Sequence, residues 1–112
     1  MNTINMNIKT WNIEELTGYK PISTFYEDFS IGERFTESGV NQTYYKIFRE
    51  WKDDYRYLTE LVMVLNWKIW EHYENGNQKM AEQYNTYWIW ASQYAENTLK
   101  GEELQYYYRT TD

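Results

Sequence analysis

The only histidine of the chain, His72, is the residue best suited to acid–base or metal chemistry, and it lies close to Glu71 and Glu74. A typical zinc or iron site needs several histidine or cysteine ligands, and the sequence contains no second histidine and no cysteine. Near the C-terminus of a helix, the helix dipole stabilises a charged imidazole. The sequence therefore predicts a half-buried, structural His72, with no metal and no cofactor.

Carboxylates are plentiful, but their spacing does not indicate catalysis. They form the adjacent pairs Glu14-Glu15, Glu27-Asp28, Asp53-Asp54 and Glu102-Glu103. Adjacent helical residues point in different directions, whereas catalysis by two carboxylates needs both groups held across one cleft. The glycines stand singly, and no serine has the spacing of a nucleophile elbow. We expect solvated faces and helix caps, no catalytic residue and no enzymatic activity.

Aromatic residues make up 21% of the chain and include 13 tyrosines and 6 tryptophans. Tyr and Trp combine an apolar ring with a polar tip, which suits surfaces that are partly buried. Trp67, Trp70, Trp88, Trp90 and the segment 106–108 could form a stacking platform for bases or sugars. Surfaces that bind single strands interleave aromatic residues with Lys and Arg, which are sparse here. A core combined with a protein interface is therefore the favoured interpretation.

The elements that position these residues are predicted to be helices, which makes the fold all-α. Apolar residues recur at spacings of three and four from residue 40 onward, as on one face of a helix. They are Val40, Tyr44, Ile47, Phe48, Trp51, Tyr55, Leu58, Val62, Leu65, Ile69 and Tyr73. The pattern predicts one helix over 40–74, about 50 Å long. Only Asp53-Asp54 offers a break, and continuity across this pair is left open.

Oppositely charged residues four positions apart support the same helix. The pairs are Lys46–Glu50, Arg49–Asp53 and Arg56–Glu60.

A second long helix over 77–100 should run antiparallel to the first, because Asn75-Gly76-Asn77 is a turn signal. Its buried face comprises Met80, Tyr84, Tyr87, Trp88, Ala91, Tyr94, Ala95 and Thr98. Ile89 falls almost opposite this face and Trp90 lies on its flank, so neither has a core to enter. The tail, 102–112, is interpreted as a last helical turn or an extended segment.

Residues 1–38 contain the only proline and should form an irregular arm with short helices, within a single domain spanning 1–112. Asn12 is positioned to cap one helix and Gly18 to end it, while Thr24 and Glu27 have the spacing of a capping box. The apolar residues of the arm are expected to pack on the long helices. They are Ile13, Leu16, Phe25, Phe29 and Phe35.

The charge balance bears on partners and location. Seventeen acidic and 11 basic residues give a net charge of −6, which disfavours direct binding to nucleic acid. The longest strongly apolar run, 61–65, is far shorter than the roughly 20 residues that span a membrane. Residues 1–7 lack the features of a secretory signal, and the absence of cysteine fits a reducing compartment. We expect a soluble, cytoplasmic protein.

Two segments carry a family resemblance. YLTELVMVLNWK at 57–68 and LKGEEL at 99–104 resemble segments of small helical proteins of unknown activity. Phages and conjugative elements of gut-type bacteria encode those proteins. The resemblance implies an accessory protein of a mobile element, and it implies no activity, cofactor or site residue.

These observations lead to three hypotheses from different classes. The first is a non-enzymatic interaction protein, expected to form a homo-oligomer, whose contact surface includes Ile89, Trp90, Trp67 and Trp70. The second is an acidic inhibitor that mimics nucleic acid to block a nuclease or repressor. The third is a module that binds a small molecule or sugar between Trp and Tyr side chains.

Overall fold

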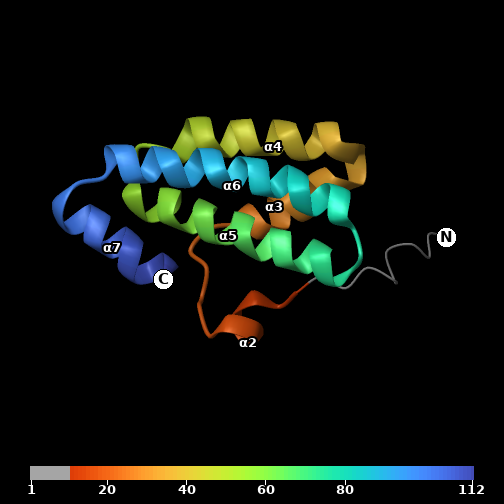
Figure 1. Cartoon of the computed structure of the whole chain (residues 1–112), viewed down its shortest axis with the longest axis horizontal. Helices are drawn as coiled ribbons and strands as arrows, with labels where there is room; N and C mark the ends of the chain where they lie inside the picture. Colours follow the sequence, from red (N-terminus) through yellow and green to blue (C-terminus); the bar gives the residue numbers. More distant parts are fainter. Residues whose placement is uncertain (1–10) are drawn as a thin grey trace.

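The computed structural model describes residues 11–112, which form helices and connecting turns without any strand. The prediction of an all-α fold is therefore confirmed for this part of the chain (Figure 1). The elements are α2 (Ile13–Thr17), α3 (Phe25–Gly32), the 3₁₀ turn η1 (Glu33–Phe35), α4 (Thr36–Trp51), α5 (Tyr55–Glu74), α6 (Gln78–Thr98) and α7 (Gly101–Thr111). The prediction that residues 1–7 are not a secretory signal concerns residues that lie outside the described part of the chain.

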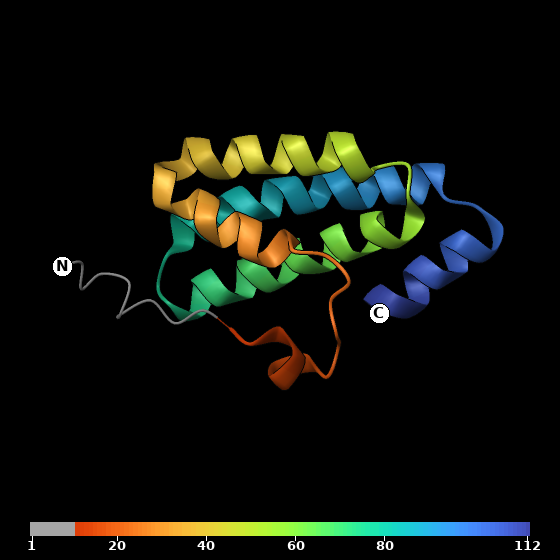
Figure 2. The same cartoon turned by 180° about the vertical axis from the view of Figure 1, so that it is seen from behind.

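The bundle is built around the hairpin of α5 and α6, which is the most extensive contact between elements. Helix α4 lies along α6, α3 packs against α4 and α5, and α7 folds back along α5 (Figures 1 and 2). The molecule measures 50 × 29 × 21 Å. The fully buried apolar side chains include Phe29, Val40, Leu58, Leu61, Val64, Leu65, Ala81, Tyr84, Ala91 and Ala95. No helix within 11–112 is long and apolar enough to cross a membrane.

The turn between α5 and α6 has the predicted form. Gly76 adopts φ +77°, a left-handed conformation that glycine reaches without strain. Asn77 then caps α6, because its side-chain oxygen accepts a hydrogen bond from the backbone N–H of Met80 at 3.2 Å. The antiparallel hairpin predicted from Asn75-Gly76-Asn77 is thus confirmed.

The prediction of one helix over 40–74 is wrong. Helix α4 ends at Trp51 and α5 begins at Tyr55, so the chain reverses direction between them. Asp54 is extended, with φ −107° and ψ 109°, and its side chain accepts a hydrogen bond from the N–H of Arg56 at 3.1 Å. Asp54 therefore acts as an N-cap, and the apolar stripe continues in phase only because both helices face the same core.

None of the three predicted ion pairs, Lys46–Glu50, Arg49–Asp53 and Arg56–Glu60, is among the salt bridges of residues 11–112, and two other pairs form at this break. Lys52 pairs with Asp53 at 3.3 Å and Arg56 with Asp54 at 3.8 Å, in place of Arg49–Asp53 and Arg56–Glu60. The carboxylate of Glu60 is fully buried and binds the N-terminal arm instead.

The N-terminal arm follows the predictions in part. Asn12 accepts a hydrogen bond from the N–H of Glu15, and Gly18 ends α2 with φ +77°. Thr24 precedes α3, but its hydroxyl donates to Asp28, so the predicted capping box is wrong.

Three of the five apolar side chains assigned to this arm are buried, namely Ile13, Phe25 and Phe29. Leu16 and Phe35 are 61% and 67% exposed, so their predicted burial is wrong. In η1 it is Glu33 that turns toward the interior, and Phe35 therefore points to solvent.

The tail is helical. Gly101, with φ +58°, precedes two acidic residues in the first turn of α7, where the helix dipole favours negative charge. Helix α7 buries Tyr107, which is 3% exposed, and the neighbouring residue Leu99 is 7% exposed. Of the two interpretations of residues 102–112, the helical one is confirmed.

Replacing the cap of α5 should destabilise the bundle. We expect Asp54→Ala to lower the free energy of unfolding by about 1 kcal/mol, because the N–H of Arg56 loses its acceptor. Asp53→Ala is the matched control, since Asp53 is exposed and caps nothing. Urea unfolding followed by tryptophan fluorescence measures both variants, and equal losses would contradict the assignment of Asp54 as the cap.

Candidate functional site

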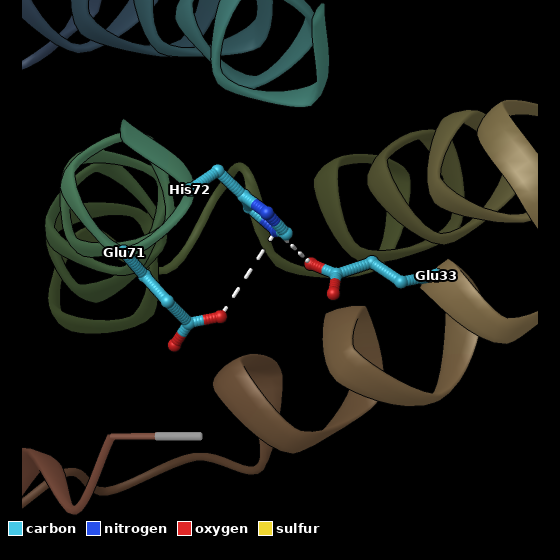
Figure 3. Close-up of side chains that lie close together, drawn as sticks. All are labelled: Glu33, Glu71 and His72. Atoms are coloured by element: carbon cyan, nitrogen blue, oxygen red, sulfur yellow. Dashed lines mark hydrogen bonds and ion pairs between the residues drawn. The ribbon is translucent and has the colours of Figure 1, made fainter. Parts of the chain in front are cut away.

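The largest concentration of titratable side chains is buried between α3, η1, α5 and α6. We call it the Lys68 cluster. Its members are Tyr26, Ser30, Glu33, Lys68, Glu71, His72 and Tyr84. Figure 3 shows Glu71 and His72 of α5 extending toward Glu33 of η1.

The ammonium group of Lys68 lies at the centre of this cluster. Its Nζ is 3.1 Å from Oε2 of Glu33 and 3.1 Å from Oε2 of Glu71. It also donates a hydrogen bond to Oγ of Ser30 at 2.7 Å and lies 4.3 Å from the centre of the Tyr26 ring. The Lys68 side chain has no exposed surface, so these contacts replace its hydration completely.

His72 is buried, rather than half-buried as predicted, with 7% of its surface exposed. Its Nε2 lies 2.8 Å from Oε2 of Glu33, and its ring stacks on that of Tyr84 with centroids 5.6 Å apart. The Tyr84 hydroxyl donates to the same Glu33 oxygen at 2.6 Å. Two basic side chains, Lys68 and His72, thus face the two carboxyl groups of Glu33 and Glu71.

The environment of the cluster alters the pKa of three members. Burial raises the pKa of Glu33, but the hydrogen bond from His72, the charge of Lys68 and the hydrogen bond from Tyr84 together lower it below its ordinary value of 4.5. Burial and the charge of Glu33 raise the pKa of Tyr84 far above its ordinary value. Burial and the hydrogen bond to Glu71 do the same for Tyr26. Both tyrosines therefore remain hydroxyl donors.

Glu33, Glu71 and His72 also have the ligand types of a metal site, with three donor atoms within 4.8 Å of one another. However, Oε2 of Glu33 is already approached by His72, Tyr84 and Lys68. Glu71 accepts from Tyr26 and Lys68, and no buried side-chain N or O atom of residues 11–112 lacks a partner. A metal ion would have to displace the Lys68 ammonium, so the geometry supports a structural role.

A second buried carboxylate, that of Glu60, joins the arm to α5. Its Oε1 accepts hydrogen bonds from the Tyr19 hydroxyl and the Ile22 N–H, both at 2.9 Å. Its Oε2 accepts from the Ser23 N–H at 2.8 Å and from the Ser23 hydroxyl. Burial and the Glu60 hydrogen bond raise the pKa of Tyr19, which keeps its hydroxyl a donor. Four donors from one loop thus meet a single side chain.

An aromatic surface lies where α4 meets α6, and we call it the α4–α6 face. Its lower layer is the stacked pair Tyr44 and Tyr87, whose centroids are 4.5 Å apart with rings inclined by 10°. Trp90 lies above this layer, 5.8 Å from Tyr87 and 6.4 Å from Tyr45. Tyr45 and Trp90 are 45% and 46% exposed, although both pack against other rings.

Further contacts extend this face along both helices. Phe48 and Tyr94 pack edge to face at 5.0 Å, and Nζ of Lys52 lies 5.9 Å from the centre of the Tyr94 ring. The Tyr87 hydroxyl donates to Asn41 at 2.7 Å, which joins the two helices by a polar contact.

The four predicted interface residues come from α5 and α6 and have different surroundings. Trp90 belongs to the α4–α6 face, whereas Ile89, 39% exposed, precedes it by one position along the helix and points about 100° away. Trp70 is 55% exposed and packs against Tyr73. Trp67 is half-buried, 5.8 Å from Tyr19 of the arm. The predicted exposure of Ile89 and Trp90 agrees with the structure, and their role as an interface stays a prediction.

A groove of about 360 Å³ lies between α5, α6 and α7 and brings together Trp67 and Trp88. Its lining residues are Val62, Met63, Asn66, Trp67, Trp88, Ser92, Glu96, Tyr107, Tyr108, Thr110, Thr111 and Asp112. Of the aromatic residues predicted as a stacking platform, Trp67, Trp88, Tyr107 and Tyr108 meet here, while Trp70 and Trp90 lie elsewhere.

Sequence reasoning missed Glu33, Glu60 and Lys68. A signal for two of them exists, because Glu60, Val64 and Lys68 follow one another at intervals of four and so share one face of α5. Their hydrogen-bond and ion-pair partners lie in the loop at 19–23 and at residue 33, more than 30 positions away in the sequence. Helical periodicity carries no information about partners at that distance.

Comparison with known proteins found no family model, no curated protein and no solved structure that matches the chain.

The Lys68 cluster should make stability depend on pH. Because the pKa of folded Glu33 is below 4.5, its carboxylate stabilises the fold fully above the pH at which unfolded Glu titrates, and this contribution is lost as the pH falls through the folded pKa. We expect Glu33→Gln to cost roughly 3 kcal/mol at pH 7 and to flatten the fall in unfolding free energy between about pH 5 and pH 2.

Urea unfolding at a series of pH values measures this dependence, with Glu14→Gln as a control for the loss of one negative charge from an exposed position. A slope in Glu33→Gln equal to that of the wild type would contradict the role assigned to Glu33.

The attachment of the arm should depend on Glu60. In Glu60→Gln one carboxylate oxygen becomes an NH₂ group, which cannot accept from Ser23 or Ile22, so we expect a loss of about 2 kcal/mol. Hydrogen exchange should accelerate at the Ile22 and Ser23 amides more than at amides of α6. Glu103→Gln, on the exposed surface of α7, is the control, and a uniform change in exchange would argue against this specific anchoring.

Proposed function

We propose that this protein is a non-enzymatic interaction module that binds a protein partner through the α4–α6 face. The supporting observation is that Tyr45 and Trp90, from two different helices, pack together while each leaves nearly half of its surface exposed. Trp and Tyr are the residues most enriched among those that dominate binding energy at interfaces.

The rigidity of this face favours binding. Trp90 contacts the rings of Tyr44, Tyr45 and Tyr87, and the stacked pair beneath it is buried. Side chains that are already ordered lose little conformational entropy when a partner covers them. The exposed rings therefore offer apolar contact area at a low entropic cost.

The polar groups around the rings also suit a protein interface. Arg49 is exposed one helical turn after Tyr45, and Lys52 lies over the ring of Tyr94. Asn41 and Gln83 bind the Tyr87 hydroxyl at the edge of the same face. An apolar centre with a rim of amides and cations is typical of protein–protein contact surfaces.

The other two hypotheses have less support. Mimicry of nucleic acid needs ranks of exposed carboxylates, and Glu33, Glu60 and Glu71 are occupied by contacts inside the bundle. A sugar-binding module would use the groove between α5, α6 and α7, which is a separate site and does not account for the exposed rings of the α4–α6 face. An accessory role in a mobile element is compatible with an interaction module and remains part of the proposal.

A second copy of the chain is the first partner to test. Light scattering on a sizing column, from about 5 to about 500 µM, should show a dimer in the wild type and in Trp70→Gln. Trp90→Gln should weaken the dimer at least tenfold, since a central tryptophan contributes roughly 2 kcal/mol. Trp70 is the matched control because it is at least as exposed as Trp90 but packs against Tyr73, off this face.

If the wild type is a monomer at every concentration, the homo-oligomer hypothesis is wrong, and the partner must be a different protein. Affinity capture with the same three baits then decides the proposal. A protein retained by the wild type and Trp70→Gln but lost with Trp90→Gln supports it. The absence of both self-association and such a captured protein would refute the interaction module.

A further inference from the structure

The groove between α5, α6 and α7 combines aromatic walls with negative charge. Trp67 of α5, Trp88 of α6 and Tyr107 and Tyr108 of α7 all line it, so rings from three helices surround one space. Both tryptophans are half-buried and Tyr108 is 49% exposed, which leaves part of each ring accessible. The groove is distinct from the α4–α6 face and shares no residue with it.

The charged residues that line the groove are Glu96 and Asp112, and no Lys or Arg is among its lining residues. Arg109 of α7 is the basic residue closest in sequence to Asp112. Its guanidinium carbon lies 5.9 Å from the centre of the Tyr106 ring, and neither Arg109 nor Tyr106 lines the groove. Within residues 11–112 the Glu96 carboxylate forms neither a salt bridge nor a hydrogen bond. The ion pairs made by residues of α5 and α6 include those of Lys68 with Glu71 and of Lys79 with Glu37. Its charge is therefore available to a ligand.

We propose that this groove binds a small organic cation with an alkylated ammonium group. The faces of Trp and Tyr rings carry negative potential and attract such cations, and quaternary ammonium groups are recognised by aromatic walls of this kind. Glu96 supplies the opposite charge at one side of the groove. Anions are repelled by the same carboxylates, and a neutral ligand gains no net Coulombic attraction from them.

The size of the groove fits a small ligand. A volume of about 360 Å³ is at the lower end of the range of ligand sites, roughly 300 to 1,000 Å³. The amide of Asn66 and the hydroxyl of Ser92 lie in the same lining. These groups can bind a polar group of the same ligand, such as the hydroxyl that choline carries two carbons away from its ammonium nitrogen.

Titration with choline, followed by the amide and indole N–H signals in NMR spectra, tests the proposal. We expect saturable shifts at Asn66, Ser92 and the Trp88 indole, with a dissociation constant in the millimolar range. The uncharged carbon analogue, 3,3-dimethylbutan-1-ol, should bind at least about tenfold more weakly, because it has the same shape but no charge. Sodium chloride at the same concentration controls for ionic strength.

Matched variants locate the site. Glu96→Gln should weaken choline binding roughly threefold to tenfold, whereas Glu82→Gln, an exposed glutamate on the same helix, should leave it unchanged. Trp90→Gln should bind choline as the wild type does, which separates this site from the α4–α6 face. A short peptide carrying trimethyllysine identifies the source of the ammonium group: tighter binding than choline indicates a protein side chain, and weaker binding indicates a free amine.

Three results would overturn the proposal. They are equal binding of choline and its uncharged analogue, unchanged choline binding by Glu96→Gln, and the absence of saturable shifts at the groove at choline concentrations far above the millimolar range.

Discussion

The burial of charge on α5 is the constraint on which the rest of the structure depends. Glu60, Lys68 and Glu71 are at most 1% exposed on a single helix. An isolated charge in a protein interior costs several kcal/mol, so each of these groups must meet partners with good geometry. The partners come from 19–33, which places the arm, α3 and η1 against α5. Apolar packing forms the α5–α6 hairpin, and buried polar contacts position the N-terminal segment on it.

The use of one side of α5 for polar contacts and another for apolar packing explains why so many aromatic rings remain at the surface. One side of α5 is occupied by the polar contacts and another by the seam with α6, so the bundle has limited apolar interior. Small residues of α6, such as Ala81, Ala91 and Ala95, allow close approach of the two helices. Large rings are then placed at the edges of the seam, where they form the α4–α6 face on one side and the groove with α7 on another.

Local signals in the sequence predicted the local structure well. Asn12 and Gly18 delimit α2, Asn77 caps α6, and helical phase correctly left Ile89 and Trp90 outside the core. The break before Tyr55 was missed because α4 and α5 face the same core, which leaves their periodicity in register. The buried charges were missed because their partners are distant in sequence. His72, predicted to be half-buried beside Glu71 and Glu74, is instead buried, and Glu33 of η1 binds its ring.

The most direct test of this account is the coupling free energy between Glu33 and Lys68, which lie on different elements and approach to 3.1 Å. Urea unfolding of Glu33→Gln, Lys68→Met and the double variant gives this quantity as the departure from additivity. If buried charge attaches η1 to α5, the double variant should be more stable than the sum of the single losses predicts by at least about 1.5 kcal/mol. Losses that add within about 0.5 kcal/mol would show that the two side chains act independently, and would contradict the account.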